Sequence, residues 1–352
     1  MAILEGVPAG LALSAADVDT DLARRQRGYG RGGRQKIEKD TVSIEAGVRG
    51  GETLGSPIAL GVENRDFANW ARRMGAAPFD TPPEPLTRPR PGHADLAGGL
   101  KYDRHDLRDV LERASARETA ARTAAGAVAR VLLAAVGIDV FAAVSAIGGV
   151  TARMDEPLVT LKSRARASDL ACPDAEAESA MREAILAAAH AGDTLGGAFT
   201  VFATGVMPGL GSHVHWDRKL DGRLAQALMS IHAIKAVGVG IGAEVASRRG
   251  SEVHDPIAYD LVGRRFSRPT NHAGGLEGGV TNGEPVVVQG FMKPIATLKR
   301  ALPSVDVRTK EVFEAAFERS DVAPFRRHRW WPRRWCAWSS PTRSSKNSAG
   351  TR

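Results

Sequence analysis

Cysteine is almost absent from this chain of 352 residues, which contains only Cys172 and Cys336. The two cysteines lie far apart without the spacing of metal ligands, so we expect neither a disulfide framework nor a metal site. Long apolar runs are also missing, because no stretch reaches the roughly 18 apolar residues of a transmembrane helix. The N-terminus lacks the basic start and apolar core of a secretory signal. These absences favour a soluble, cytoplasmic protein without a membrane partner.

Acidic residues are absent from the C-terminal segment 322–352, which contains eight basic residues and four tryptophans. The formal net charge of the whole chain is +8, so residues 1–321 are formally neutral. The segment has no helical or alternating apolar period and ends in a polar run. We therefore expect an aberrant, disordered tail. Its basic and aromatic content leaves a nucleic-acid-binding tail as an alternative.

Residues 1–321 have the regular patterning of a folded domain. Capping boxes, apolar residues at helical spacing and alternating apolar residues distinguish the expected helices from the expected strands. The expected helices cover residues 15–27, 116–136, 174–192 and 217–231, and the expected strands cover 42–48, 140–147 and 286–288. Helices and strands alternate irregularly, and no sequence repeat is evident. The sequence therefore predicts an α+β fold with a single layered domain over residues 1–321.

Five arginines crowd residues 24–34, interleaved with four glycines. Within this segment Gly28-Tyr-Gly-Arg-Gly-Gly33 matches the dinucleotide fingerprint, which requires a buried strand before it and a helix after it. Arginines at a helix end precede it here, so we predict no Rossmann site. Arginine binds phosphate and carboxylate through two hydrogen bonds, and glycine lets the backbone approach a ligand. The segment therefore favours an anion site, with a solvated basic loop as the alternative.

A second loop, Arg88-Pro-Arg-Pro-Gly-His-Ala-Asp95, combines arginine with a rigid backbone. The prolines on either side of Arg90 fix φ, which suits a preorganised site. His93 in such a loop is a candidate general acid, and a packed or surface histidine is equally open. Arg49, within Gly47-Val-Arg-Gly-Gly51, repeats the combination of arginine with a flexible backbone.

Three further segments combine cations or exposed backbone with tight turns. Ser115 is expected at a helix N-terminus between Arg113 and Arg117, where the backbone N–H groups and the helix dipole favour an anion. An ordinary capped helix with surface arginines is the alternative there. Asn271–Gly279 has four glycines within six residues, which would pack closely against a flat or multiply anionic ligand. Lys293-Pro294 places a cation in a fixed turn after the last expected strand.

Taken together, and in their order along the chain, these motifs closely resemble those of the chorismate synthase family. The matches span nearly all of residues 3–321. The matching segments are Leu22–Gln26 through Gly30–Gly32, Gly55–Ile58, Arg88–Asp95, Glu112–Thr119, Met229–Lys235, Asn271–Gly279, Lys293-Pro294 and Arg319–Asp321. Several of these segments define the family, and the chain is identified on them as a member.

The resemblance implies an enzyme of the shikimate pathway to aromatic amino acids. Members eliminate phosphate from 5-enolpyruvylshikimate 3-phosphate in a 1,4 sense to give chorismate, which makes them carbon-oxygen lyases acting on phosphates. They need reduced FMN although no net redox change occurs, and NADPH only where a member reduces its own flavin. The resemblance also implies a β-α-β sandwich and a homotetramer. A substrate with two carboxylates and a phosphate would account for the many arginines in a neutral body.

The resemblance also implies roles for particular residues. His93 would protonate the reduced flavin or the leaving phosphate region, and Asp321 would act with flavin N5 in removing the ring proton. The expected anion contacts are Arg25 and Arg31 for NADPH or substrate, and Arg49 and Arg117 for substrate. The expected FMN contacts are Arg113, Ala114, Ser115, His232, Ala233, Gly278, Lys293, Pro294, Ile295, Ala296, Thr297 and Arg319.

Two departures from the family pattern leave alternatives open. Members begin with a strand that carries a Gly-Glu-Ser-His-Gly motif, so we expect this chain to be truncated at its N-terminus and to lack the second family histidine. After Asp321 the apolar helix of the family gives way to the basic tail, which we hypothesise is translated in a shifted reading frame. The alternatives are therefore an inactive or truncated family member and, second, a basic-tailed nucleic-acid-binding protein. The interpretation that we favour has no nucleic-acid partner.

Overall fold

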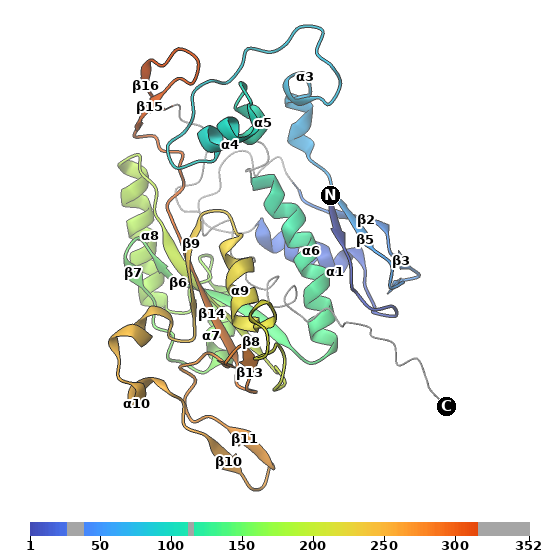
Figure 1. Cartoon of the computed structure of the whole chain (residues 1–352), viewed down its shortest axis with the longest axis vertical. Helices are drawn as coiled ribbons and strands as arrows, with labels where there is room; N and C mark the ends of the chain where they lie inside the picture. Colours follow the sequence, from blue (N-terminus) through green and yellow to red (C-terminus); the bar gives the residue numbers. More distant parts are fainter. Residues whose placement is uncertain (27–38, 112–115, 316–352) are drawn as a thin grey trace.

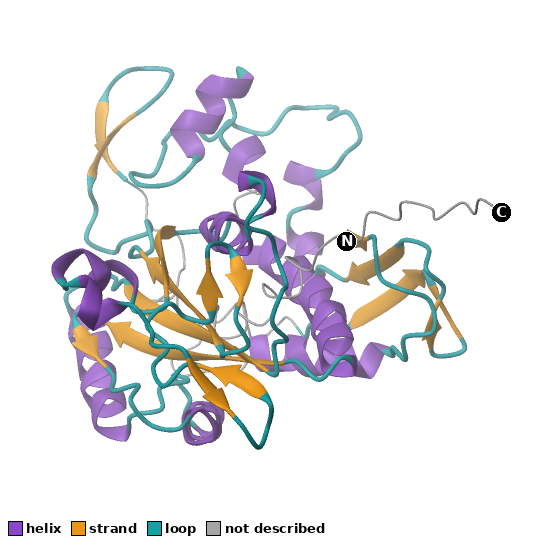
Figure 2. Ribbon diagram, turned by 60° about the horizontal axis from the view of Figure 1, so that its bottom comes forward, coloured by secondary structure: helices purple, strands orange, loops and turns teal. Residues whose placement is uncertain are grey.

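Two antiparallel sheets, with helices between and beside them, make up most of the protein (Figures 1 and 2). The computed structural model describes residues 1–26, 39–111 and 116–315. Within these ranges no helix is long and apolar enough to cross a membrane. The domain boundary predicted at residue 321 lies outside the described residues.

The smaller sheet has three strands in the order β1-β5-β2, all antiparallel. Its strands are β1 (Ala2–Leu4), β2 (Val42–Ala46) and β5 (Ile58–Val62), and the short strands β3 (Val48–Arg49) and β4 (Glu52–Thr53) pair beside it. Leu4, Ile58 and Leu60 are buried against helix α1 (Ala15–Arg25) and helix α6 (Ala116–Ala135). One face of this sheet therefore forms a core with the two helices.

The larger sheet has five strands in the order β7-β6-β8-β14-β9, also antiparallel. Its strands are β6 (Asp139–Ile147), β7 (Val150–Thr151), β8 (Gly197–Thr204), β9 (Ile234–Val239) and β14 (Val286–Met292). Buried side chains of α6, α8 (Ala175–His190) and α9 (Leu220–Met229) cover one face. Helix α7 (Leu158–Ala167) covers the other face, where Phe141 and Phe202 stack with centroids 4.9 Å apart.

Helix α6 connects the two sheets because it packs on both of them. Its alanines, the residues with the highest helix propensity, are small enough to let neighbouring elements approach closely. Ala124, Ala127 and Val128 face the small sheet, whereas Ala129 and Leu133 belong to the core of the large sheet. The layering is therefore sheet, helix, sheet, and it confirms the predicted α+β fold and β-α-β sandwich.

Local signals explain where the helices begin. At α1 the backbone N–H of Ser14 donates to the Asp17 carboxylate at 2.9 Å, as the predicted capping box requires. At α8 the Asp174 carboxylate accepts hydrogen bonds from the N–H groups of Glu176 and Ala177. Helix α9 begins at Leu220, three residues after the predicted start at Asp217, because a 3-10 turn precedes it.

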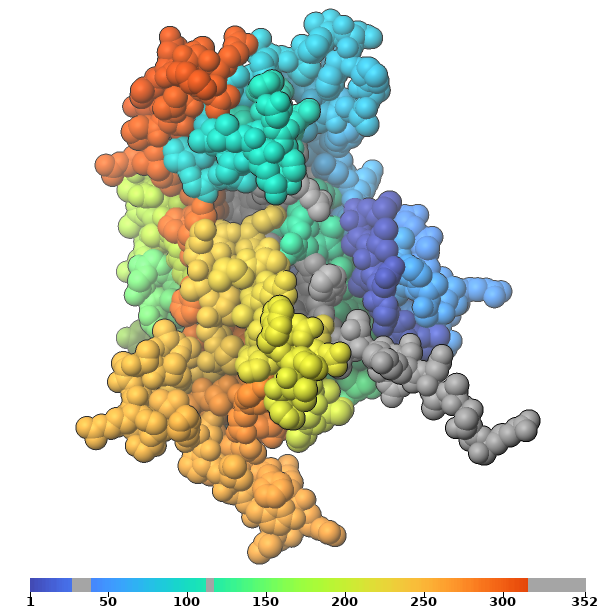
Figure 3. All heavy atoms as spheres, in the orientation of Figure 1, coloured from blue at the N-terminus to red at the C-terminus, as the bar shows by residue number. Residues whose placement is uncertain are grey.

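Shorter elements surround the two sheets. They are the 3-10 turns η1 (Arg65–Asn69), η2 (Trp216–Arg218) and η3 (Gly242–Ser247), the helices α3 (Ala71–Met74), α4 (Asp95–Tyr102), α5 (Arg108–Leu111) and α10 (Gly250–Val253), and the strands β10 (Ala258–Asp260), β11 (Arg265–Ser267), β12 (Leu276–Glu277), β13 (Val280–Thr281), β15 (Pro303–Val305) and β16 (Val312–Glu314). The hairpin of β10 and β11 projects from the body of the molecule (Figure 3).

Candidate active site

The loop 88–95 lies against the segment 293–297 that follows strand β14. The ammonium group of Lys293 donates a hydrogen bond to the carbonyl oxygen of Gly92. A Cβ at Gly92 would lie 3.3 Å from Lys293 Nζ and 3.6 Å from Ala296 Cβ, and the φ of Gly92 is +76°. Glycine is therefore the residue that permits both this turn and this close approach.

His93 is held by two other residues of the same loop. Its Nδ1 lies 2.5 Å from Asp95 Oδ1, and Arg90 Nε donates to Asp95 Oδ2 at 2.9 Å. Arg90 Nη2 lies 3.1 Å from Nδ1 and 3.3 Å from Nε2 of the imidazole. The side chain of Asp95 is 1% exposed and that of His93 is 20% exposed. The buried ion pair of Arg90 and Asp95 therefore fixes the position of His93, whose ring stays partly exposed.

The Asp95 carboxyl is ionised in this cluster. Burial alone would raise its pKa, but hydrogen bonds from His93 and Arg90, with the charge of Arg90, outweigh burial and hold the pKa well below its usual range. An ionised carboxylate can only accept hydrogen bonds. The proton between His93 and Asp95 therefore belongs to the imidazole.

The segment after β14 brings two further candidate residues to the same place. The backbone N–H of Lys293 donates to the carbonyl oxygen of Ala233 at 2.9 Å, so Lys293 lies beside His232 and Ala233. Nε2 of His232 lies 3.5 Å from Oε2 of Glu118, which belongs to the first turn of α6. The structure thus brings together His93, His232, Ala233 and the segment 293–297.

Two lysines give this region an unmatched positive charge. Burial lowers the pKa of Lys293, and repulsion from Lys235 lowers it further. Across the part of the chain that the structure describes, neither lysine forms an ion pair with a carboxylate. A bound phosphate or carboxylate would relieve this repulsion. The cationic donors of the region therefore fit an anionic ligand such as a phosphorylated cofactor or substrate.

Arg25 and Arg117 meet at the buried carboxylate of Asp40. The two Nη1 atoms lie 2.7 Å and 2.5 Å from Oδ2 and Oδ1 of Asp40, whose side chain is 0% exposed. Arg25 also donates from Nη2 to Thr119 Oγ1 at 2.8 Å. One carboxylate thus fixes two guanidinium groups.

Other sequence-predicted residues lie elsewhere. Arg49 is exposed on β3 at the outer edge of the small sheet (Figure 1). Gly278 forms the turn between β12 and β13 with Gly279, and both have positive φ. The loop that carries Gly278 and Gly279 is hydrogen-bonded to the beginning of β14, whereas Lys293 directly follows the end of this strand. Because seven strand residues span about 20 Å, Gly278 and Lys293 lie at opposite ends of β14. Among the described residues neither Arg49 nor Gly278 forms a hydrogen bond or ion pair with the loop 88–95, and their expected ligand contacts stay predictions.

Six of the sequence-predicted residues lie outside the described residues. They are Arg31, Arg113, Ala114, Ser115, Arg319 and Asp321. Their expected roles stay predictions.

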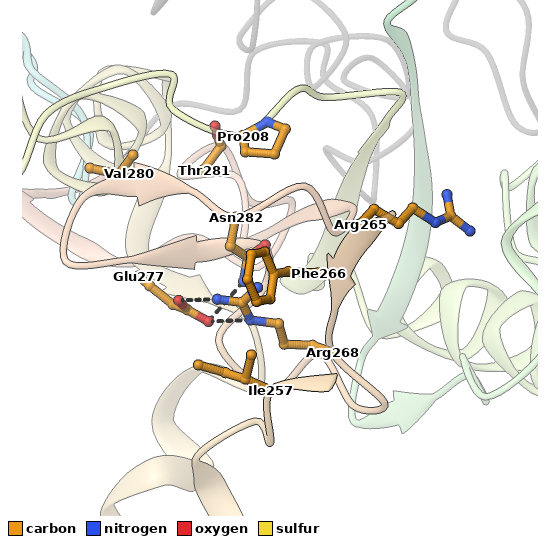
Figure 4. A pocket seen from close by; sticks show the side chains of 9 residues that line it. All are labelled: Pro208, Ile257, Arg265, Phe266, Arg268, Glu277, Val280, Thr281 and Asn282. Atoms are coloured by element: carbon orange, nitrogen blue, oxygen red, sulfur yellow. Dashed lines mark hydrogen bonds and ion pairs between the residues drawn. The ribbon is translucent and has the colours of Figure 1, made fainter. Parts of the chain in front are cut away.

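A groove of about 590 Å³ lies near the turn at Gly278 (Figure 4). It is lined by Pro208, Ile257, Arg265, Phe266, Arg268, Glu277, Val280, Thr281 and Asn282. Arg268 donates two hydrogen bonds to the Glu277 carboxylate, from Nε at 3.0 Å and from Nη2 at 2.8 Å. Since the Arg268 charge is matched inside the groove, this surface lacks the unpaired cations found around Lys293.

No metal site was expected, and among residues 1–26, 39–111 and 116–315 no group of three or more histidine, cysteine, aspartate or glutamate side chains is placed to hold a metal ion.

Two carboxylates that fix the orientation of candidate site residues, Asp40 and Asp95, were not predicted from the sequence. Asp95 could have been identified from its position two residues after His93 and at the start of a helix. Asp40 had no comparable signal, because its arginine partners are 15 and 77 residues away.

Comparisons with known proteins agree on one family. The chorismate synthase family model matches residues 1–329. A chorismate synthase of Desulforudis audaxviator is 57% identical over 322 residues, which cover 91% of this chain and 82% of the relative. One of Moorella thermoacetica is 58% identical over 320 residues, covering 91% and 83%. A solved structure described as a chorismate synthase superposes with a TM-score of 0.70 at 44% identity, covering 84% of this chain and 80% of that one.

Proposed function

Since the chain belongs to the chorismate synthase family, we propose that it converts 5-enolpyruvylshikimate 3-phosphate to chorismate. In this 1,4-elimination the ring loses a proton at one carbon and phosphate at another. The electron pair of the broken C–H bond forms a new ring double bond, the existing ring double bond shifts by one position, and phosphate leaves with the electron pair of the broken C–O bond. The enzyme is then a carbon-oxygen lyase acting on phosphates, without net redox change. The comparisons support neither alternative, an inactive homologue or a nucleic-acid-binding protein.

The observation that carries the proposal is the convergence of His93 with Lys293 and His232. Phosphate elimination needs cations for the leaving group and a proton donor beside it. Lys293 and Lys235 supply cations without carboxylate partners in the described chain, and His93 supplies an imidazole in a fixed loop. The reacting phosphate would therefore lie between the loop 88–95 and the segment 293–297.

Reduced FMN is the proposed cofactor, and when bound it would supply N5 as the partner of a carboxylate in the removal of the ring proton. Among the described residues, His232, Ala233 and the segment 293–297 are the group that would hold it, and the lysine cluster fits its phosphate. The predicted contacts Arg113, Ala114, Ser115, Gly278 and Arg319 complete the proposal. Asp321 is the proposed carboxylate for the removal of the ring proton.

Arginines supply the remaining anion contacts in this proposal. Asp40 orients Arg25 and Arg117 as a pair, and we propose that guanidinium N–H groups of this pair contact a carboxylate of the substrate. Arg49 is a further proposed substrate contact. If the chain reduces its own flavin, Arg25 and Arg31 would contact NADPH instead. We further propose a cytoplasmic homotetramer that acts in aromatic amino acid biosynthesis.

An oxygen-free assay tests the function. The purified full chain is mixed with 5-enolpyruvylshikimate 3-phosphate and chemically reduced FMN, and chorismate and phosphate are measured together. We expect equal amounts of both products, with none when FMN is omitted or oxidised. Bound flavin without either product would contradict the proposal and favour an inactive family member. Light scattering of the same sample tests the tetramer.

A further inference from the structure

We propose that Asp95, supported by Arg90, is a positioning residue that fixes the tautomer and orientation of His93. This inference rests on the proposed function, in which His93 handles a proton beside the leaving phosphate. It assigns to the carboxylate no contact with substrate or cofactor. Asp95 acts only through the imidazole.

The geometry makes Asp95 a fixed acceptor. It is the first residue of α4, where the helix N-terminus favours a negative charge, and its side chain is 1% exposed. Arg90 reaches both of its oxygens, from Nε at 2.9 Å and from Nη2 at 3.3 Å, and the backbone N–H of Arg90 donates to it at 3.2 Å. A carboxylate held in this way cannot turn away from His93.

The contact at 2.5 Å between His93 Nδ1 and Asp95 Oδ1 selects one tautomer. Because an ionised carboxylate has no proton to give, Nδ1 must carry the hydrogen. Nε2 is then the nitrogen that gains and loses the catalytic proton. A free histidine side chain prefers the opposite tautomer, so the proposed arrangement is one that the protein imposes.

Arg90 positions the ring without choosing the tautomer. Its Nη2 is almost equally distant from the two ring nitrogens, at 3.1 Å and 3.3 Å, whereas the nitrogen lone pairs point in diverging directions. Nη1 of Arg90 also lies 3.5 Å from Thr297 Oγ1, which couples the loop to the segment 293–297. Among the described residues, the charged groups in contact with His93 or with its neighbour Gly92 are Arg90 and Asp95 from the same loop and Lys293 from the facing segment.

Replacing the carboxylate by an amide should disturb both the charge and the tautomer. In Asp95→Asn the amide can donate to Nδ1, which permits the Nε2-protonated form, and the Arg90 charge loses its partner. We expect the preference for the Nδ1-protonated tautomer to be lost. We also expect kcat to fall at least about tenfold, with the acidic limb of its pH profile displaced and KM changed little. Asp95→Glu should restore part of the activity and of the pH profile.

Nuclear magnetic resonance of the ligand-free full chain labelled in its histidines tests the proposal directly, and His93→Gln identifies the signals of His93. We expect the Nδ1-protonated tautomer in the wild type and its loss in Asp95→Asn. Asp106→Asn is the matched control, because Asp106 also holds an arginine, Arg108, and accepts hydrogen bonds from nearby backbone, but in the described part of the chain its carboxylate forms no hydrogen bond or ion pair with a histidine. It should leave the tautomer and the pH profile unchanged.

Two results would overturn the proposal. One is an Nε2-protonated His93 in the wild type, which decides the matter even if Asp95→Asn does not fold. The other is an Asp95→Asn variant with unchanged tautomer and pH profile. A wild-type chain that forms no chorismate but has the expected tautomer, lost in Asp95→Asn, would refute the proposed function and leave this hydrogen-bond arrangement standing.

Discussion

Single side chains determine the charge of the candidate site, and they do so in two ways. In one, a buried carboxylate matches the cations, as Asp40 does for Arg25 and Arg117 and as Asp95 does for Arg90. In the other, the cations stay unmatched among the described residues, as at Lys293 and Lys235. A carboxylate partner fixes the orientation of an arginine, whereas a lysine without one can neutralise the charge of a bound anion.

Lys293→Met should therefore weaken the binding of an anion and leave the fold intact. A charged hydrogen bond contributes about 1.5–3 kcal/mol, so the Kd for FMN or for the substrate should rise about tenfold to hundredfold. Fluorescence titration with FMN measures this change. Lys101→Met is the control, because Lys101 is exposed and lies over the ring of Tyr102. Equal affinities in the two variants would contradict a role for Lys293 in anion binding.

Asp40→Asn should destabilise the protein, because it leaves two partly buried guanidinium groups without their carboxylate. Removing one partner of a buried ion pair costs about 3–5 kcal/mol. Denaturant unfolding should therefore give a free energy of unfolding lower by roughly 3 kcal/mol. Glu63→Gln breaks an exposed pair with Arg65 and should change it by less than about 0.5 kcal/mol. Similar values for both variants would show that Asp40 does not hold the arginines.

At the scale of single residues, the basic side chains of the candidate site were predicted from the sequence. The carboxylates that bind and orient them were not. His93 and Lys293 stand out because each adjoins a glycine or a proline, and Arg25 and Arg117 because each lies in a segment with several arginines. The role of Asp40 depends on contacts across 15 and 77 residues of chain, and no local pattern reports such a distance. The pairing of Lys293 with Lys235 was missed for the same reason.

Helices were easier to predict than strands because their signals are local. The capping boxes and the helical spacing of leucines located α1, α6, α8 and α9 to within a few residues. Strand β14 alternates between buried and less buried residues and was also predicted. Strand β8 is buried on both faces along six consecutive residues, so it has no alternation to detect. Strand β1 is three residues long, too short for any period.

The N-cap of α8 provides a test at this scale, with Asp174→Ala as the change. Hydrogen bonds from the side chain and backbone of Arg153 hold the pKa of Asp174 well below its usual range, aided by the N–H of Ala177. The ionised form therefore stabilises the folded state. This contribution is complete above the unfolded pKa of about 3.9 and is lost as the pH falls toward the folded pKa.

Asp174→Ala should accordingly lower the free energy of unfolding by about 1 kcal/mol at pH 7. The difference from the wild type should shrink below about pH 4, because the wild type then loses the same interaction. Denaturant unfolding across this pH range measures it. Asp169→Ala is the control, since Asp169 is 66% exposed. A difference that is constant with pH would contradict the capping role of the ionised carboxylate.

At the scale of the whole molecule, helix α6 links the architecture to the site. It packs between the two sheets, and its first turns carry Arg117, Glu118 and Thr119 to the arginine pair and to His232. The α+β class followed from the mixture of local patterns. The order of the strands did not, because β14 pairs with strands some fifty to ninety residues earlier in the chain. The patterns predicted a layered domain, but the order sheet, helix, sheet came only from the family resemblance.

The charge of the whole molecule gives the last prediction. Residues 322–352 contain eight basic residues, and the rest of the chain is formally neutral, so any strong attraction to a polyanion should depend on that segment. We expect the full chain to bind single-stranded RNA only at low salt. The logarithm of the binding constant should fall with the logarithm of the salt concentration, with a slope no steeper than about −6.

A chain ending at residue 321 should lose this binding and still bind FMN. A full-length variant with the eight basic residues changed to Gln separates charge from length, and it should behave like the shortened chain. RNA binding that survives in both variants would place a basic surface within residues 1–321 and contradict the assignment of the charge to the tail.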